Sequence, residues 1–191
     1  MNIGIVLAAG RSTRFGRANK LLVPFRGKPL AAHAADAMRG VTLVHRFAVV
    51  QDEALVPVFE GFDIVRPEIG TGQAASVVAG VTHAMSMGAG RVLIALADMP
   101  FVDAALMQAV LDRCDDRFGA GTGGYMPPAA FPAARFADLL ALTGDRGAGS
   151  LLRDLPEGAL VAAPPPASLD IDTRDDLERL DQVSAQSQPR P

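Results

Sequence analysis

Hydrophobic residues occur in short, nearly uninterrupted runs along the first half of the chain. The runs at 2–9, 46–51, 63–67 and 91–98 have the length of β-strands. The first and the last contain almost no polar residue, which is typical of strands that are covered on both faces. The pattern therefore predicts central strands of a mainly parallel sheet.

Hydrophobic residues at helical spacing separate and follow these runs. They predict one helix within 71–88 and another within 103–114, the second with Asp103 as its N-cap. Alternating strands and helices with short connections are typical of the α/β class. Ligands of such folds bind beyond the carboxyl ends of the strands, so we expect the functional residues there.

The last third of the chain is less regular. Its glycine- and proline-rich stretch 119–132 is expected to be a mobile loop or lid. Helices are then predicted at 134–142 and near 149–154, and a weak strand at 159–163. A last helix is expected to begin at Thr173, with Asp176 completing a capping-box-like pattern. We expect residues 184–191 to form a disordered tail.

Composition and charge narrow the function classes. The chain has 191 residues, 49% hydrophobic and 20% charged, which suits one soluble domain. A net charge of -3 argues against a general nucleic-acid partner. The single cysteine, Cys114, excludes an internal disulfide, and its helical context favours a buried, inert thiol. No leader or membrane-spanning run is evident, so we expect a soluble cytoplasmic protein.

A cationic loop follows the first strand. Gly10 allows close backbone approach, and the next ten positions contain Arg11, Arg14, Arg17 and Lys20. Backbone N–H groups and cationic side chains in such a turn can bind phosphate. The Gly-Lys-Ser/Thr of a P-loop is absent. The competing interpretation is a loop of solvated charges.

Three further motifs lie near predicted strand or helix ends. The segment GTGQAA (70–75) imitates a dinucleotide fingerprint but lacks the acidic residue expected about 20 positions later; Gly72 and Ser76 could still approach a base or phosphate.

Asp98 ends a hydrophobic strand, where it either meets a cation or is only a turn residue. Asp170 and Asp172 share one face if their segment is extended, although a helix cap would also explain them. Two carboxylate sites and a cationic glycine loop together indicate Mg²⁺-assisted chemistry on a nucleotide.

The motifs, taken in order, resemble one known family. The segment LAAGRSTRFGRANKLL (7–22) is similar to the signature of the nucleotidyltransferases that attach CMP or GMP to molybdopterin. GKPL (27–30), GQAAS (72–76), ADMPFV (97–102), GDRGA (144–148) and DIDTRDDL (170–177) continue the similarity over nearly the whole chain. The last two segments resemble the cytidylyltransferase branch most.

The resemblance implies a GT-A-like, Rossmann-related α/β/α fold, with a nucleotide-binding part at about 1–102 and an acceptor-side part at about 103–183. It also implies transfer of a nucleoside monophosphate, from CTP by preference, to a phosphorylated acceptor such as molybdenum-loaded molybdopterin. The implied nucleotide-binding residues are Leu7, Ala8, Ala9, Gly10, Arg14, Lys20, Gly72 and Ser76. Arg14, Lys20 and Asp98 would be the catalytic residues. Asp98 and Asp172 would bind Mg²⁺, Asp172 being preferred over Asp170 on the motif alignment alone.

One departure from the family pattern leaves the acceptor open. The segment GGYMPPAAF (123–131) stands where the family commonly has a G-H-P-V-like sequence. Alternative acceptors are a sugar phosphate or phospholactate, and guanylyl transfer is the alternative to cytidylyl transfer. A non-catalytic carrier that delivers the cofactor to a molybdoenzyme or chaperone is the alternative from another class. A monomer or weak dimer is expected.

Overall fold

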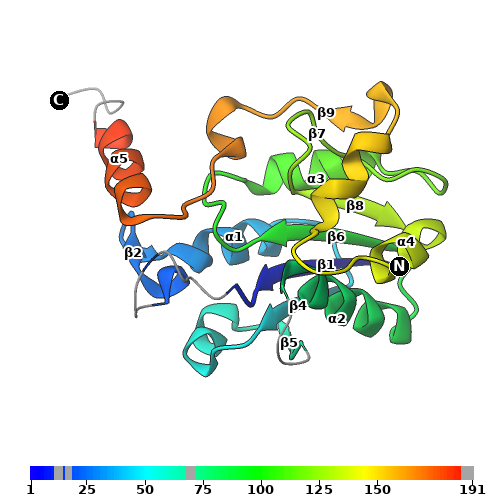
Figure 1. Ribbon diagram of the computed structural model, residues 1–191, viewed down its shortest axis with the longest axis horizontal. Coiled ribbons are helices and arrows are strands. Elements are labelled where there is room, and N and C mark those ends of the chain that lie inside the picture. Colours follow the sequence, from blue (N-terminus) through cyan, green and yellow to red (C-terminus); the bar gives the residue numbers. More distant parts are fainter. Residues whose placement is uncertain (11–14, 16–18, 68–71, 186–191) are drawn as a thin grey trace.

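The chain folds around one five-stranded sheet (Figure 1). The computed structural model describes residues 1–10, 15, 19–67 and 72–185, with only the backbone of 181–185. The strands are β1 (Asn2–Ala8), β4 (His45–Val50), β5 (Asp63–Val65), β6 (Arg91–Leu96) and β8 (Ala129–Pro132), in the spatial order β5-β4-β1-β6-β8. All neighbours are parallel except β6 and β8. The predicted mainly parallel sheet is confirmed.

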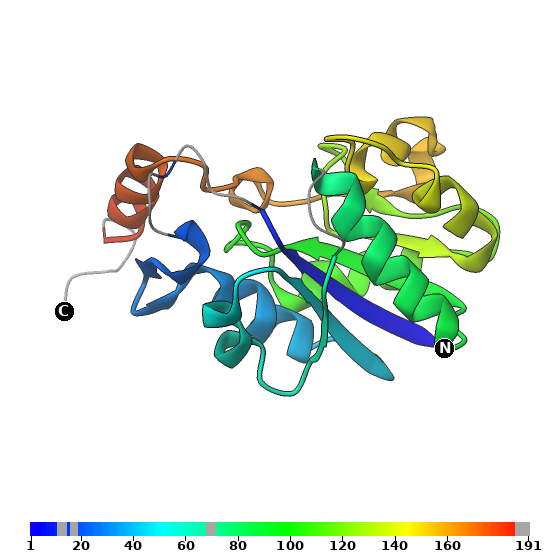
Figure 2. The same cartoon turned by 60° about the horizontal axis from the view of Figure 1, so that its bottom comes forward.

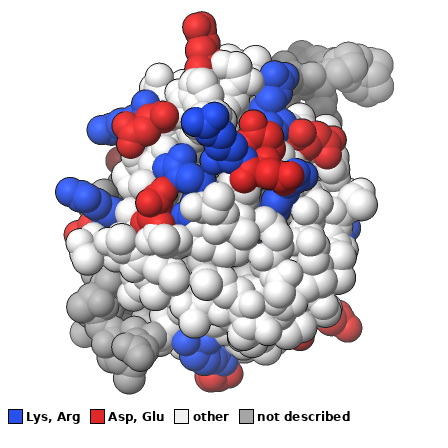
Figure 3. Space-filling view, turned by 90° about the vertical axis from the view of Figure 1, so that its right-hand side faces the viewer, with Lys and Arg blue, Asp and Glu red and all other residues white. Residues whose placement is uncertain are grey.

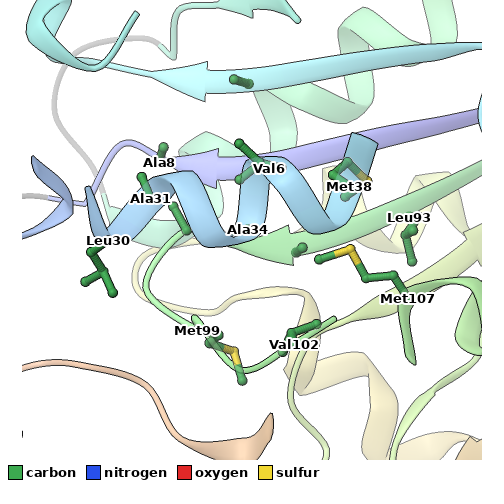
Figure 4. Packing of buried hydrophobic residues seen from close by; sticks show 14 of the residues in the cluster. Val6, Ala8, Leu30, Ala31, Ala34, Met38, Leu93, Met99, Val102 and Met107 are labelled. Carbon is green, nitrogen blue, oxygen red and sulfur yellow. The ribbon is translucent and has the colours of Figure 1, made fainter. Parts of the chain in front are cut away.

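Helices cover both faces of this sheet, as the predicted three-layer α/β/α fold requires. α1 (Leu30–Arg39) and α3 (Ala104–Arg113) pack on one face, and α2 (Gly72–Ser86) and α4 (Phe136–Leu140) on the other (Figure 2). Along β1 the side chains alternate between the two layers, so that Val6 and Ala8 meet α1 while Ile5 and Leu7 meet α2 (Figure 4). Burial on both sides explains why the strand lacks polar residues.

Close packing fixes α2 against β1. A Cβ atom added at Gly80 would lie only 2.8 Å from Ile5 Cγ2. A larger residue would therefore push the helix away from the sheet. Because α2 begins at the carboxyl edge of the sheet, this contact also helps to set the position of its first turn.

Smaller elements complete the fold. Two two-stranded sheets join β2 (Pro24–Phe25) to β3 (Lys28–Pro29) and β7 (Gly121–Thr122) to β9 (Leu160–Val161). Short 3₁₀ helices are η2 (Lys20–Leu22), η3 (Glu53–Phe59), η4 (Ala133–Arg135), η5 (Ala148–Asp154), η6 (Glu157–Ala159) and η7 (Pro165–Ser168). The final helix is α5 (Arg174–Ala185), which lies at the end of the molecule where the parallel strands finish (Figure 1).

Two sequence predictions are wrong. The glycine- and proline-rich stretch 119–132 is not a lid, because it contains β7 and the buried edge strand β8, whose Ala129 to Phe131 are fully covered. Ser184 and Ala185 belong to α5 and not to a tail, and residues 186–191 lie outside the described part. Helix α1 was also not predicted, although its buried residues recur at helical spacing. The cap of the last helix is confirmed: Asp176 N donates to Thr173 Oγ1 (3.1 Å) and Thr173 N donates to Asp176 Oδ2 (2.9 Å).

The opposite end of the molecule carries mixed charges. Figure 3 shows the face that includes the amino ends of the strands, with acidic and basic side chains interspersed in its upper part and few charges below. This face has no continuous basic surface of the kind that nucleic acid requires. Within the described residues, no helix combines the length and the hydrophobicity needed to cross a bilayer.

Candidate functional site

A cavity of about 370 Å³ opens where β1, β4 and β6 end. Parallel strands bring their carboxyl ends to one edge of a sheet, so residues far apart in sequence meet there. The cavity is lined by Leu7, Ala9, Gly10, Lys20, Leu21, Gln51, Pro67, Gly72, Gln73, Ala75, Ser76, Leu96, Asp98 and Asp145. Its size is within the range of small-molecule sites.

Lys20 joins two aspartates at one side of this cavity. Its Nζ donates to Asp98 Oδ2 at 2.8 Å and to Asp172 Oδ1 at 2.7 Å. Burial alone would lower the pKa of Lys20, but the charges and hydrogen bonds of the two aspartates outweigh it and raise that pKa above its ordinary value. Lys20 is therefore a charged ammonium held within a carboxylate pair.

The neighbouring Asn19 positions this lysine. Asn19 Oδ1 accepts a hydrogen bond from Leu21 N (3.0 Å), which caps η2, and Asn19 Nδ2 donates to Asp52 Oδ2 (2.8 Å) just beyond β4. The turn that carries Lys20 is thereby tied to the end of a central strand. Sequence reasoning missed this role, because an asparagine in a polar loop gives no distinctive signal.

Backbone contacts bring Asp172 beside Asp98. Ile171 is fully buried, and its N–H donates to Asp98 O at 3.0 Å. On the other side of Asp172, the Thr173–Asp176 cap fixes the start of α5. Two residues separated by 74 positions in sequence thus reach the same lysine.

Asp170 lies on the same segment but does not join this group. Among the described residues it forms no ion pair with Lys20 within 4 Å, and the residue is only partly buried. Partial burial, together with the negative charges of Asp172 and Asp98, raises the pKa of Asp170. The structure therefore brings Asp172, not Asp170, into contact with Lys20. The segment is also not a strand, so the condition under which the two aspartates would share one face is not met, whereas the alternative helix cap is present.

Not all of the expected nucleotide-binding residues line the cavity. Leu7, Ala9, Gly10 and Ser76 line the cavity, whereas the side chain of Ala8 is buried in the core facing α1. Arg14, with Arg11 and Arg17, lies outside the described residues.

The backbone conformation and the close packing at position 72 both require glycine. Its φ is +69°, and a Cβ there would lie 2.3 Å from Gly144 O. The close approach at Gly72 is therefore occupied by the chain's own loop.

Three further polar residues of the cavity were not singled out from the sequence. Gln51 directly follows β4, and its place after a predicted strand could have indicated it. Gln73 lies in the first turn of α2. Asp145 comes from the GDRGA segment, whose sequence carried no recognisable chemistry of its own.

Comparisons with known proteins agree with this architecture. The model of the family described as MobA-like NTP transferase domain matches residues 4–159. The purine catabolism protein PucB of Bacillus subtilis is 31% identical over 92% of this chain and 94% of its own. A phosphoenolpyruvate guanylyltransferase of Conexibacter woesei is 31% identical, covering 78% of this chain and 71% of its own. The structure of a nucleotidyl transferase from Methanothermobacter has the same fold, with a TM-score of 0.82 at 23% identity over 98% of this chain and 99% of that one.

Proposed function

Because the chain belongs to the MobA-like NTP transferase family, we propose that it transfers a nucleoside monophosphate from CTP to molybdenum-loaded molybdopterin and releases pyrophosphate. That it is a nucleotidyltransferase follows from the family. What we propose beyond the family is the base of the donor nucleotide, the identity of the acceptor and the use of Mg²⁺. The observation that carries it is the Lys20–Asp98–Asp172 group at the edge of the cavity.

Asp98 and Asp172 suit a magnesium ion. Both carboxylates approach the same Lys20 Nζ, at 2.8 and 2.7 Å, so their oxygens converge on one position. Within the described residues no group of three or more acidic, histidine or cysteine side chains could hold a metal. Mg²⁺ in phosphate-transfer sites usually takes one or two carboxylates and completes its shell with substrate phosphates and water, which matches this pair. When bound, it would neutralise charge on the phosphate oxygens.

The residues of the chain then bind and orient the reactants. Lys20, already positioned by Asn19, would contact the β- and γ-phosphates together with Arg14 and stabilise the departing pyrophosphate. A phosphate acceptor is ionised at neutral pH, so the attack needs alignment with the α-phosphorus and no general base. Leu7, Ala9, Ala75 and Pro67 would pack against the nucleoside in the apolar part of the cavity.

The preference for CTP rests on the resemblance of residues 144–148 and 170–177 to the cytidylyltransferase branch. GTP is the second candidate donor, because several relatives are named guanylyltransferases, including one for molybdenum cofactor that is 34% identical over 65% of this chain and 61% of its own. A non-catalytic carrier is disfavoured, because it would have no need for Lys20 between two aspartates.

Pyrophosphate release tests the proposal directly. Each of the four NTPs would be supplied with Mg²⁺ and, in turn, with molybdenum-loaded molybdopterin, phosphoenolpyruvate and a sugar 1-phosphate. We expect release with CTP that depends on the pterin. Selective release with GTP would correct the base, and release with another acceptor would correct the acceptor. NTP binding without release in any combination would favour the carrier.

A further inference from the structure

The loop at 144–148 is built onto the wall of the nucleotide cavity. Ala74 N, in the first turn of α2, donates to Gly144 O at 3.1 Å. A Cβ at Gly72 would lie 2.6 Å from Asp145 Oδ1, and one at Gly147 would lie 2.1 Å from Gln73 Oε1. These close approaches tie the loop to α2, so that the position of Asp145 is fixed by the fold.

Asp145 places an acidic side chain in the wall of a cavity that, on the proposed function, binds an anionic nucleoside triphosphate. The residue lines the cavity beside Gly72 and Gln73. It lies next to the amino end of the 15-residue helix α2, whose dipole favours a negative charge there. A carboxylate accepts hydrogen bonds and cannot donate them.

The charge of Asp145 excludes one of its possible ligands. A triphosphate oxygen would be repelled, so the phosphates must lie toward Lys20 and away from this carboxylate. The remaining partners in a nucleotide are neutral N–H or O–H donors of the nucleoside.

We propose that Asp145 is a specificity-determining residue that accepts a hydrogen bond from a neutral donor on the nucleoside. This inference rests on the proposed function, because it requires a nucleotide in this cavity. The donor can be a base amino group, as on cytosine, guanine or adenine, or a ribose hydroxyl. Uracil differs from cytosine by carrying an acceptor oxygen in place of the amino group, which makes the pair CTP and UTP a sensitive probe.

The test is the substitution Asp145→Asn, which keeps the shape and replaces one acceptor oxygen by a donor. The control is Asp116→Asn, the same chemical change on a side chain that is 94% exposed and pairs with Arg91 at the amino end of β6. For both variants kcat/KM would be measured with CTP, UTP, GTP, ATP and their 2′- and 3′-deoxy forms. Dissociation constants for Mg²⁺ complexes of non-hydrolysable analogues of the same nucleotides give a readout that does not depend on turnover.

If Asp145 accepts a hydrogen bond from a base amino group, Asp145→Asn should change the ratio of kcat/KM for CTP to that for UTP by about tenfold or more, since hydrogen bonds to charged groups are strong. If Asp145 accepts a hydrogen bond from a ribose hydroxyl, the ratio of kcat/KM for the ribonucleotide to that for the deoxynucleotide should fall by a similar factor for every base. Equal effects on all nucleotides, or none, would overturn the role of Asp145. Nucleotide binding without turnover by the unsubstituted protein would contradict the proposed function alone, and the dissociation constants would still decide on Asp145. Absence of NTP binding would contradict both.

Discussion

The two aspartates that meet at Lys20 are supported by very different parts of the molecule. Asp98 lies two residues beyond the end of β6, a central strand paired with β1 and β8, and its side chain is 22% exposed. Asp172 lies in an irregular segment between η7 and α5, and its side chain is 41% exposed. One carboxylate is thus positioned by the sheet, and the other by a small number of individual contacts.

The contacts around Asp172 are of several kinds. Ile171 N binds Asp98 O, and the Arg174 guanidinium lies 5.7 Å from the centre of the Phe15 ring. The capping box of Thr173 and Asp176 sets the direction in which α5 departs. The site therefore combines an aspartate held by the central sheet with an aspartate that depends on a small number of interactions. Substitutions in the two regions should differ in their effects if this difference in support is important for function.

The largest expected effect is at the sheet end. Asp98→Asn should lower kcat for Mg²⁺-dependent pyrophosphate release by about 100- to 1000-fold, as removal of one well-placed electrostatic partner does in other enzymes. Asp172→Asn should lower kcat less, because its greater exposure weakens its interactions through solvent screening. Steady-state kinetics of the two variants measures the difference. Equal losses would show that the C-terminal segment is as important as the strand end.

Lys20→Ala removes the group that both regions share. We expect about 10- to 100-fold weaker binding of NTP, since a charge-assisted contact to phosphate is lost, and a much smaller change for the nucleoside monophosphate. Titration calorimetry with CTP and CMP compares them. Lys28→Ala is a matched control, because Lys28 pairs with Asp36 on α1 and does not line the cavity. A similar weakening for both nucleotides would mean that Lys20 does not contact the β- and γ-phosphates.

The sequence predicted the sheet-based part of this site better than the rest. Strand β6 is a continuous hydrophobic run, and an aspartate that ends such a run must emerge at the sheet edge. Asp98 could therefore be expected to meet a cation, and its ion pair with Lys20 bears this out. The same reasoning gave the positions of β1, β4 and β5 to within a few residues.

Contacts between distant segments could not be predicted in this way. Nothing in the local pattern indicates that Ile171 binds the backbone of Asp98 or that Asp145 reaches the first turn of α2. The strand β8 was missed because glycine and proline around it indicate a loop, while its burial depends on pairing with β6. Helix α1 was missed although its buried residues, mainly alanines, recur at helical spacing.

A smaller effect is expected from the cap of α5. Thr173→Ala removes the hydroxyl that accepts a hydrogen bond from Asp176 N, which should cost about 1 kcal/mol of unfolding free energy. Because Asp172 precedes this cap, the activity should also fall by a few fold, which urea denaturation and kinetics together would detect. Thr173→Ser keeps the hydroxyl and should restore both properties. A stability loss without any change in activity would show that the cap does not position Asp172.

The smallest predicted effect concerns the pH at which each region loses stability. Near the sheet end, His33 Nε2 donates to Phe25 O at 2.9 Å. Burial together with the charges of Lys28 and Arg26 lowers the pKa of His33 below its ordinary 6.5, although this hydrogen bond and the charge of Asp36 act in the opposite direction. The unfolded chain therefore takes up a proton here before the folded chain does, so stability should fall as the pH drops through and below 6.5. In the C-terminal segment, hydrogen bonds from Thr173 lower the pKa of Asp176, so its contribution should fade only below the ordinary 3.8.

The unfolding free energy of wild type and His33→Gln, measured in urea between pH 8 and 5, isolates the first contribution. The difference between the two proteins should change over that range in favour of the variant at the acidic end. The corresponding difference for Asp176→Asn should stay constant over the same range, because that carboxylate keeps its charge there in both the folded and the unfolded chain. A pH-independent His33 difference would mean that this histidine does not distinguish the sheet end from the C-terminal segment.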